Sequence, residues 1–382
     1  MKCPGRFSSL WVNSKSPAKI HPDLVCLLLQ IKTMFLGKLM TSCLRGERTT
    51  SYKSSCSEIS SLKNGGLLVE ELIRISNGDY NPFCVFSEHE LKQATKDYDQ
   101  NLVLLLDDNY SLFQGVLENR GVVLIKKTND HDELVEYCIR EIAIAAYVST
   151  NRNLVKLLGC CLESKVPIIV FEYVPNGNLS AYLQEEKLIL PWRCKVRIAA
   201  QVAAAIDYLH VGKSRPLIHR HVKTGNILLD ANLNAKLFDF GLSLEIPLGE
   251  TYVQALVEGT IGFIAPESVD TGKFNEKTDV FAFGATLIEI LTGLEPHDVF
   301  IQASSTDRFP SLTPAAESSL IPVPLPTRRD LLVFLKSNLI NDAKQNALNA
   351  TAELAARCVD VLPEKRPMIE QVAKELRQIQ NM

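Results

Sequence analysis

The sequence lacks any long uninterrupted run of apolar residues. Its most apolar leader stretch, residues 24–44, is broken by Gln30, Lys32 and Lys38, and its longest unbroken part is Leu24–Leu29. A helix that spans a bilayer needs about 20 consecutive apolar residues. The stretch therefore does not predict a membrane span.

The cysteines lack the paired spacing that metal sites and disulfide frameworks require. There are ten cysteines in the chain, but no two stand in a CxxC pair. This scatter excludes a regular disulfide framework and predicts reduced thiols, as in cytosolic proteins. Cys160 and Cys161 lie in an apolar run and are expected to be small core residues.

An excess of positive charge is also missing from most of the chain. Residues 1–60 hold nine Lys or Arg and three acidic residues, a net charge of +6. The other 322 residues hold 32 basic and 41 acidic side chains, a net charge of −9. A nucleic-acid-binding surface needs a basic field, so we expect no nucleic acid partner.

The first 60 residues form a basic leader that we expect to be disordered. A lysine at position 2 excludes myristoylation. Cysteines beside basic residues leave palmitoylation or peripheral membrane association open, at Cys3, Cys26 and Cys43. The serine-containing, nearly acid-free composition also leaves a transit peptide open.

Residues 61–96 are expected to form a helical flank. A short helix is predicted over 67–75, after Asn64-Gly65-Gly66. Ser87 and Glu90 have the spacing of a capping box and predict the start of a second helix.

From residue 97 the pattern predicts a sheet followed by helices. Short apolar runs separated by turn residues over 102–127 predict antiparallel strands, and a helix is expected near Leu134–Tyr147. Two more strand-like runs end near residue 173. Helical periodicity then dominates, with an extended surface loop predicted between Val299 and Pro326. The fold class is therefore α+β.

Four motifs follow one another in a fixed order: VLIKK ending at Lys127, HRHVKTGNILLD at 219–230, AKLFDFGLS at 235–243 and GFIAPES at 262–268. In this order they resemble the protein-kinase family. The resemblance implies a bilobal domain over 97–378, with a small, mainly antiparallel β N-lobe (97–173) and a larger, mainly α C-lobe (174–378).

The resemblance also implies a site for ATP and Mg²⁺. Lys126 matches the lysine that holds the α and β phosphates, with Glu141 as its ion-pair partner. Lys223 matches the loop lysine that steadies the γ phosphate, and Asn226 and Asp239 match the two magnesium ligands. These residues are all present.

Three departures argue against catalysis. His221 stands where the catalytic aspartate of the family belongs; imidazole can in principle accept a proton, but it is bulkier than a carboxylate. Leu124 replaces the alanine that lines the adenine slot. The loop that should carry glycines has none, because Leu105, Asp107 or Asp108, and Tyr110 occupy those positions. We therefore expect weak ATP binding.

Residues that maintain the kinase scaffold are retained. Asp279 matches the buried aspartate that anchors the catalytic loop, and Glu267 with Arg366 matches the ion pair of the C-lobe. His219 and Phe240 match the apolar spine between the lobes. Their presence predicts a folded C-lobe.

Within the kinases, segments such as LVKLLGCCLE and GETYVQALVEGTIGF resemble plant receptor-like kinases, above all the wall-associated-kinase-like proteins. The flank and the segment IPLGET resemble the receptor-like cytoplasmic pseudokinases of the ZED-related group. This resemblance implies a cytoplasmic adaptor in immune signalling, located in the cytoplasm or at the inner face of the plasma membrane. The implied partners are a leucine-rich-repeat immune receptor and other cytoplasmic kinases.

The alternative hypotheses are a weak ATP-dependent protein serine/threonine kinase and a nucleotide-sensing switch. For the adaptor, the segment Leu242–Gly262 is the candidate partner surface, and we expect several of its apolar residues to be exposed. These are Ile246, Pro247, Leu248, Tyr252, Val253, Leu256 and Val257.

Overall fold

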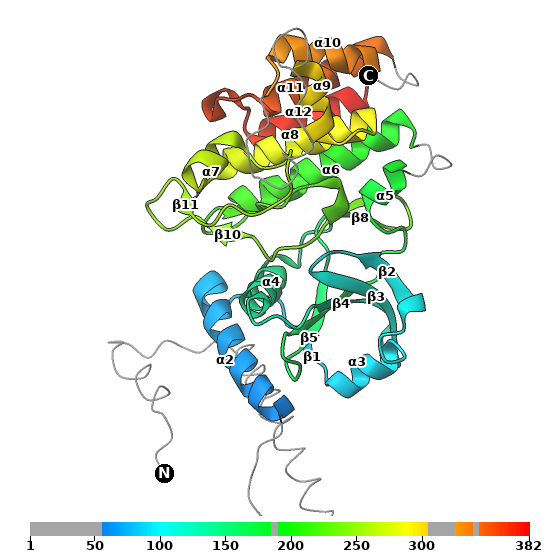
Figure 1. Cartoon of the computed structure of the whole chain (residues 1–382), viewed down its shortest axis with the longest axis vertical. Coiled ribbons are helices and arrows are strands. Elements are labelled where there is room, and N and C mark those ends of the chain that lie inside the picture. The colour runs from blue at the N-terminus through cyan, green and yellow to red at the C-terminus, as the bar shows by residue number, and fades with distance from the viewer. Residues whose placement is uncertain (1–55, 185–189, 305–324, 339–343) are drawn as a thin grey trace, which may run out of the picture.

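The computed structural model describes residues 56–184, 190–304, 325–338 and 344–382. Figure 1 shows two lobes, a sheet-rich N-lobe and a helical C-lobe, joined near residue 174. The α+β, bilobal fold class expected from the sequence is confirmed. Expectations for leader residues 1–55 and for loop residues 305–324 lie outside the described residues.

The N-lobe is built on a six-stranded sheet of order β1-β5-β6-β4-β3-β2. Neighbouring strands are antiparallel except β1 and β5, which are parallel. The strands are β1 (Cys84–Val85), β2 (Val103–Leu106), β3 (Tyr110–Leu117), β4 (Gly121–Thr128), β5 (Leu157–Cys161) and β6 (Ile168–Glu172). Register pairs Leu124 with Phe171, which places Leu124 and Lys126 on the face toward the cleft.

Each face of this sheet is covered by a helix. Helix α4 (Leu134–Val148) packs on the cleft-side face, and its apolar residues join the large core that continues into the C-lobe. Helix α3 (Glu88–Ala94) covers the other face and starts at the expected Ser87–Glu90 capping box. A short 3-10 helix, η1 (Gln100–Leu102), leads into β2.

Helix α2 (Cys56–Ser76) is longer than the helix predicted over 67–75. The prediction is wrong at its start, because α2 runs unbroken through Gly65 and Gly66. Each glycine costs a helix about 1 kcal/mol relative to alanine. Packing outweighs this cost, since Leu68 and Leu72 are fully buried. Asn64 adds an anchor: its Nδ2 donates to the carbonyl oxygens of Leu162 (3.2 Å) and Ser164 (3.0 Å). The flank therefore begins at least five residues earlier than expected.

The C-lobe consists of helices around a common core, and its described residues also form three short strand pairs. The helices are α5 (Leu179–Gln184), α6 (Trp192–Val211), α7 (Pro266–Thr271), α8 (Glu276–Thr292), α9 (Pro296–Ser304), α10 (Arg328–Asn338), α11 (Gln345–Cys358) and α12 (Ile369–Gln380), with 3-10 turns η2 (Thr224–Asn226) and η4 (Pro363–Lys365). The strand pairs are β7 (Leu217–Ile218) with β10 (Leu244–Glu245), β8 (Ile227–Leu229) with β9 (Ala235–Leu237), and β11 (Val253–Gln254) with β12 (Lys273–Phe274).

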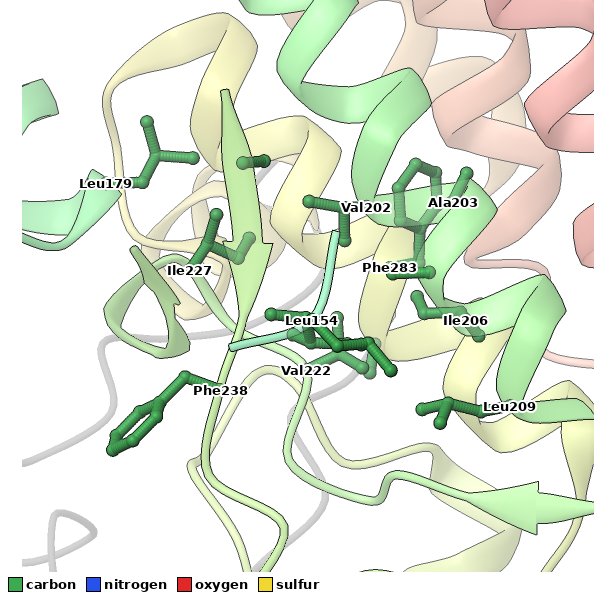
Figure 2. Close-up of a cluster of buried hydrophobic side chains, with 14 of the residues drawn as sticks. Leu154, Leu179, Val202, Ala203, Ile206, Leu209, Val222, Ile227, Phe238 and Phe283 are labelled. Atoms are coloured by element: carbon green, nitrogen blue, oxygen red, sulfur yellow. The ribbon is translucent and has the colours of Figure 1, made fainter. Parts of the chain in front are cut away.

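The helical core follows the periodicity of the sequence. The apolar face of α6, including Val202, Ile206 and Leu209, is buried, and Figure 2 shows it packed beside Phe283 of α8. The sequence predicted that a surface loop starts at Val299, and this predicted start is wrong. Val299 and its neighbours belong to α9, because this segment buries an apolar stripe against the lobe.

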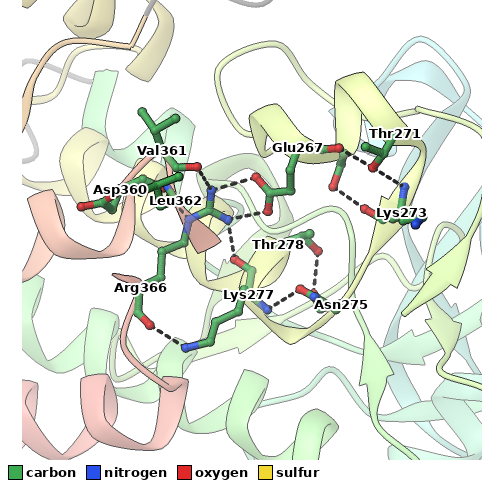
Figure 3. Close-up of polar contacts among 11 residues, drawn as sticks. Glu267, Thr271, Lys273, Asn275, Lys277, Thr278, Asp360, Val361, Leu362 and Arg366 are labelled. Carbon is green, nitrogen blue, oxygen red and sulfur yellow. Dashed lines mark hydrogen bonds and ion pairs between the residues drawn. The ribbon is translucent and has the colours of Figure 1, made fainter. Parts of the chain in front are cut away.

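Two polar anchors hold the C-lobe in shape. Arg366 is fully buried and makes a bidentate ion pair with Glu267, at 2.6 and 2.8 Å (Figure 3). Asp279 is also fully buried and accepts hydrogen bonds from the backbone N–H groups of His219 (2.8 Å) and Arg220 (2.9 Å). Arg220 has a φ of +65°, so this aspartate secures a loop conformation that a non-glycine residue rarely adopts.

Candidate functional site

A buried ion-pair network lies at the junction of the two lobes. The ammonium of Lys126, on β4, donates to Glu141 Oε2 of α4 at 2.7 Å and to Asp239 Oδ1 at 2.8 Å. Asp239 follows β9 and has a φ of +68°. The structure thus brings together three of the residues that the sequence singled out, and the expected pair of Lys126 with Glu141 is present.

The three charges of this network shift one another's pKa. Burial raises the pKa of Glu141 to about 7, although Lys126 opposes this shift. For Asp239, burial also favours the neutral acid, but Lys126 and His221 together outweigh burial and hold its pKa well below the usual range. The two carboxylates in turn outweigh the effect of burial on Lys126 and raise its pKa. The positive charge of Lys126 is therefore stabilised more by Asp239 than by Glu141.

His221 forms a hydrogen bond with the second carboxylate oxygen of Asp239. Its Nδ1 lies 2.9 Å from Asp239 Oδ2. An ionised carboxylate only accepts hydrogen bonds, so Nδ1 is the donor. An aspartate at position 221 could not make this contact. Position 221 therefore holds a hydrogen-bond donor to Asp239, a role that sequence reasoning did not find.

The other loop residues are tied to one another. Lys223 Nζ donates to Thr260 Oγ1 at 3.2 Å, and the same hydroxyl lies 3.5 Å from His221 Nε2. Asn226 Nδ2 donates to the carbonyl oxygen of His221 at 2.9 Å. His221, Lys223 and Asn226 lie in one loop, as the motif implied, and these hydrogen bonds hold the loop together and connect it to Thr260.

The two residues that match the family's magnesium ligands, Asp239 and Asn226, make hydrogen bonds within the protein. Both oxygens of Asp239 accept from protein side chains. Asn226 donates through Nδ2 to the carbonyl of His221, and its amide oxygen is the atom that a metal would bind. Across the described ranges, no group of three His, Cys, Asp or Glu residues is arranged to hold a metal ion.

Aromatic side chains fill the inner part of the cleft. Tyr110 replaces a loop glycine, and its buried ring lies 4.1 Å from Lys126 Nζ, measured to the ring centroid. Phe238 packs edge-on against Tyr110 (6.2 Å) and Phe171 (5.3 Å), and Leu124 pairs with Phe171 across the strands. Figure 2 shows the ring of Phe238 pointing away from the helical cluster. These rings and Leu124 form a packed apolar cluster around Lys126.

Sequence reasoning identified Leu124 and Tyr110 but missed Phe171 and Phe238. Both phenylalanines are fully buried. Phe238 could have been found from its place directly before Asp239, and Phe171 from its place in the apolar strand that follows β5. Only the strand register shows that Phe171 lies opposite Leu124.

An outer cavity of about 450 Å³ remains beside the network, between the β2–β3 turn, α4 and the segment near Thr260. Its lining includes two lysines and one histidine but six carboxylates: Asp107, Asp108, Glu133, Glu141, Asp239 and Glu258. Asp108 and Glu133 are exposed, whereas Glu141 and Asp239 are buried and paired with Lys126. The lining of this cavity therefore carries an excess of negative charge.

Comparison with known proteins places these features in a family. Residues 111–376 match the family model described as protein tyrosine and serine/threonine kinase. Three similar proteins come from Arabidopsis thaliana. Wall-associated receptor kinase-like 4 is 34% identical over 84% of this chain and 41% of its own length. Putative wall-associated receptor kinase-like 16 is 35% identical over 82% of this chain and 70% of its own length.

Wall-associated receptor kinase 5 is 36% identical over 82% of this chain and 41% of its own length. The chain thus spans about two fifths of two of these relatives. Among the described residues, no helix is both long enough and apolar enough to cross a bilayer. The match over the kinase motifs and both lobes shows that the chain belongs to the protein tyrosine and serine/threonine kinase family and is related to the wall-associated receptor kinases.

Proposed function

We propose that this protein is a pseudokinase that acts as a protein-binding adaptor in plant immune signalling. The observation that carries the proposal is the state of Asp239, whose two oxygens bind Lys126 and His221 while Tyr110 covers the lysine. Phosphoryl transfer depends on positioning ATP, magnesium and an acceptor hydroxyl. Residues of this site obstruct each of these three requirements.

The resemblance to the ZED-related group supports the choice of partners. These are a leucine-rich-repeat immune receptor and other cytoplasmic kinases, reached in the cytoplasm or at the inner face of the plasma membrane. ATP and Mg²⁺ are at most weak ligands in this proposal.

The segment after Asp239 offers a surface for such partners. Leu248 and Leu256 are 88% and 75% exposed, which is unusual for leucine in a folded chain. Ile246, which the sequence analysis placed among the exposed candidates, is buried at 3% exposure. It packs with Ile218 and Phe274 under the β7–β10 pair.

Nucleotide binding and transfer test the loss of catalysis. A ligand at 100 times its Kd stabilises a protein by about 2.7 kcal/mol, so millimolar ATP with Mg²⁺ should shift the melting temperature clearly if binding is tight. We expect no clear shift and no phosphate transfer to a generic protein substrate. Autophosphorylation that disappears in Asp239→Asn would refute the pseudokinase proposal.

Partner binding tests the adaptor role separately. The double variant Leu248→Ala/Leu256→Ala should weaken co-purification with a plant leucine-rich-repeat immune receptor or a receptor-like cytoplasmic kinase. Each buried anchor contributes about 1 to 2 kcal/mol at an interface, and its removal from an exposed site should leave the melting temperature unchanged. Val333→Ala, at an exposed position on α10, is the matched control. Unchanged recovery of both partners would contradict this surface.

One observation favours the alternative, a weak serine/threonine kinase. His221 is oriented by Asp239 through Nδ1, which leaves Nε2 directed toward the hydroxyl of Thr260 and the outer cavity. A histidine held in this way is a competent proton acceptor. Transfer that is lost in His221→Ala would favour this alternative.

A further inference from the structure

The C-terminal end of α2 makes polar contacts with the C-lobe. Arg215, in the loop before β7, donates through Nη2 to the carbonyl oxygen of Arg74 at 2.9 Å. The same Nη2 lies 2.6 Å from Glu245 Oε2, and Arg74 Nη1 lies 3.6 Å from that oxygen. Figure 1 shows this end of α2 directed toward the C-lobe, near β10. We call Arg74, Arg215 and Glu245 the strap cluster.

Glu245 is the buried member of the strap cluster. Its side chain is only 2% exposed, whereas those of Arg74 and Arg215 are 47% and 28% exposed. Burial raises the pKa of Glu245, although both arginines oppose this shift. A buried carboxylate is costly unless it is paired with a counterion. The position of Glu245 on β10 therefore depends on the two arginines.

The body of α2 is fixed to the N-lobe. Leu68, Leu72 and Ile75 are buried and belong to the same apolar core as α4. Asn64 is anchored to the loop after β5. Helix α2 is thus attached to the N-lobe along its length and to the C-lobe at its end, so that it bridges the two lobes.

The partner segment, which we define as residues 242–262, also contacts the N-lobe near both of its ends. Tyr137 of α4 donates through its hydroxyl to Glu258 Oε1 at 2.7 Å. Arg140 of α4 donates to the carbonyl oxygen of Gly241, directly before the segment, at 3.2 Å. The strap cluster lies between these two contacts in the chain and connects the segment to α2 instead of α4.

The strap cluster lies close to the exposed part of the partner segment. Ile246, the neighbour of Glu245, is buried, and its N–H donates to the carbonyl oxygen of Pro216 at 2.9 Å. Two residues later, Leu248 is 88% exposed. Pro247 stands between them, and its ring fixes φ and limits the freedom of the backbone. A shift of Glu245 should therefore be passed on to Leu248.

We propose that α2 controls the conformation of the partner segment through the strap cluster. While the cluster is formed, β10 is fixed and the exposed leucines that follow it are held in one arrangement. When the end of α2 detaches, Glu245 loses its counterions and the segment becomes mobile. By linkage, a partner that binds the segment in its fixed arrangement also strengthens the attachment of α2. The part of this inference that concerns partners rests on the proposed function.

Amide hydrogen exchange of the full chain tests the coupling without any partner. The double variant Arg74→Ala/Arg215→Ala should speed the exchange of residues 244–250 by at least about fivefold, while α12 keeps its wild-type rates. The reciprocal variant Glu245→Met keeps the size of the side chain and accepts no ion pair, and it should speed exchange in residues 70–76 of α2. In the Glu245→Met background the two arginine substitutions should have no further effect on residues 244–250, because the cluster is already lost.

Two control variants separate the strap cluster from a general loss of charge. Arg328→Ala removes an arginine from a surface ion pair with Glu353 (2.9 Å) and should leave the exchange of residues 244–250 unchanged. Arg74→Lys/Arg215→Lys retains both positive charges and should keep most of the protection that the alanine variant loses.

Three results would overturn the inference. The first is wild-type exchange of residues 244–250 in the arginine double variant. The second is an equal acceleration in α12, which would indicate a general loss of stability. The third is a further acceleration by the arginine substitutions in the Glu245→Met background. Partner recovery is a separate measurement: if only Leu248→Ala/Leu256→Ala fails to reduce it, the adaptor surface is refuted and the coupling stands.

Discussion

Replacing His221 by the aspartate of active kinases should destabilise this protein rather than activate it. In the structure His221 Nδ1 donates to Asp239, and the exposed fractions of the two side chains are only 17% and 11%. His221→Asp removes this hydrogen bond, at a cost of about 1 kcal/mol. It also places two carboxylates near each other. At an effective dielectric constant of about 20 and a separation of about 5 Å, they repel by roughly 3 kcal/mol.

The expected loss in the free energy of unfolding is thus about 2 to 4 kcal/mol near neutral pH. Thermal or urea unfolding measures it. His221→Asn is the matched control, because it has the size of aspartate but no charge; it should lose only about 1 kcal/mol. We expect no phosphate transfer by either variant, since Tyr110 and Leu124, the other departures from the family pattern, remain in place. A His221→Asp protein that is as stable as the asparagine variant would refute the electrostatic reasoning.

Three further predictions follow from buried polar groups. Asn64→Ala should lower the free energy of unfolding by about 1 to 3 kcal/mol, because two carbonyl groups lose their donor, whereas the exposed control Lys63→Ala should change it little; equal losses would contradict the anchor. Arg366→Ala should cost about 3 to 5 kcal/mol in urea unfolding, and the surface-pair variant Arg328→Ala less than about 1 kcal/mol; a reversed order would refute the role of burial. Burial raises the pKa of Glu289 to about 7, so the folded state binds a proton that the unfolded state releases, and stability should fall as pH rises from about 5 to about 7. Glu289→Gln should flatten this part of the melting-temperature profile, and an unchanged slope would contradict the assignment.

Much of the fold could be read from the sequence because local patterns specify it. The helical periodicity after residue 173 predicted a mainly helical C-lobe, and the Ser87–Glu90 spacing placed the start of α3. The ordered kinase motifs assigned Lys126 and Asp239 to one site although they are 113 residues apart, and the structure shows that the two side chains are in contact. The family pattern supplied this long-range information.

Local patterns failed where packing decided between two outcomes. Gly65-Gly66 indicated a break, but α2 continues through both glycines because burial of its apolar side and the anchor at Asn64 outweigh their propensity. Val299 indicated the start of a loop, but it belongs to α9, which packs on the helical core. In each case the energy of tertiary contacts exceeded a local preference of about 1 kcal/mol.

The sequence by itself determined the family, the two lobes and the loss of the usual proton acceptor, because residue identities at motif positions are sufficient for those conclusions. Only the tertiary structure decided what the substituted residues do. His221 donates to Asp239, and Tyr110 covers Lys126, with Phe238 packed against the tyrosine. These contacts join strands and loops that are distant in the chain. Their geometry is set by strand register and by close packing of buried rings, which no local pattern contains.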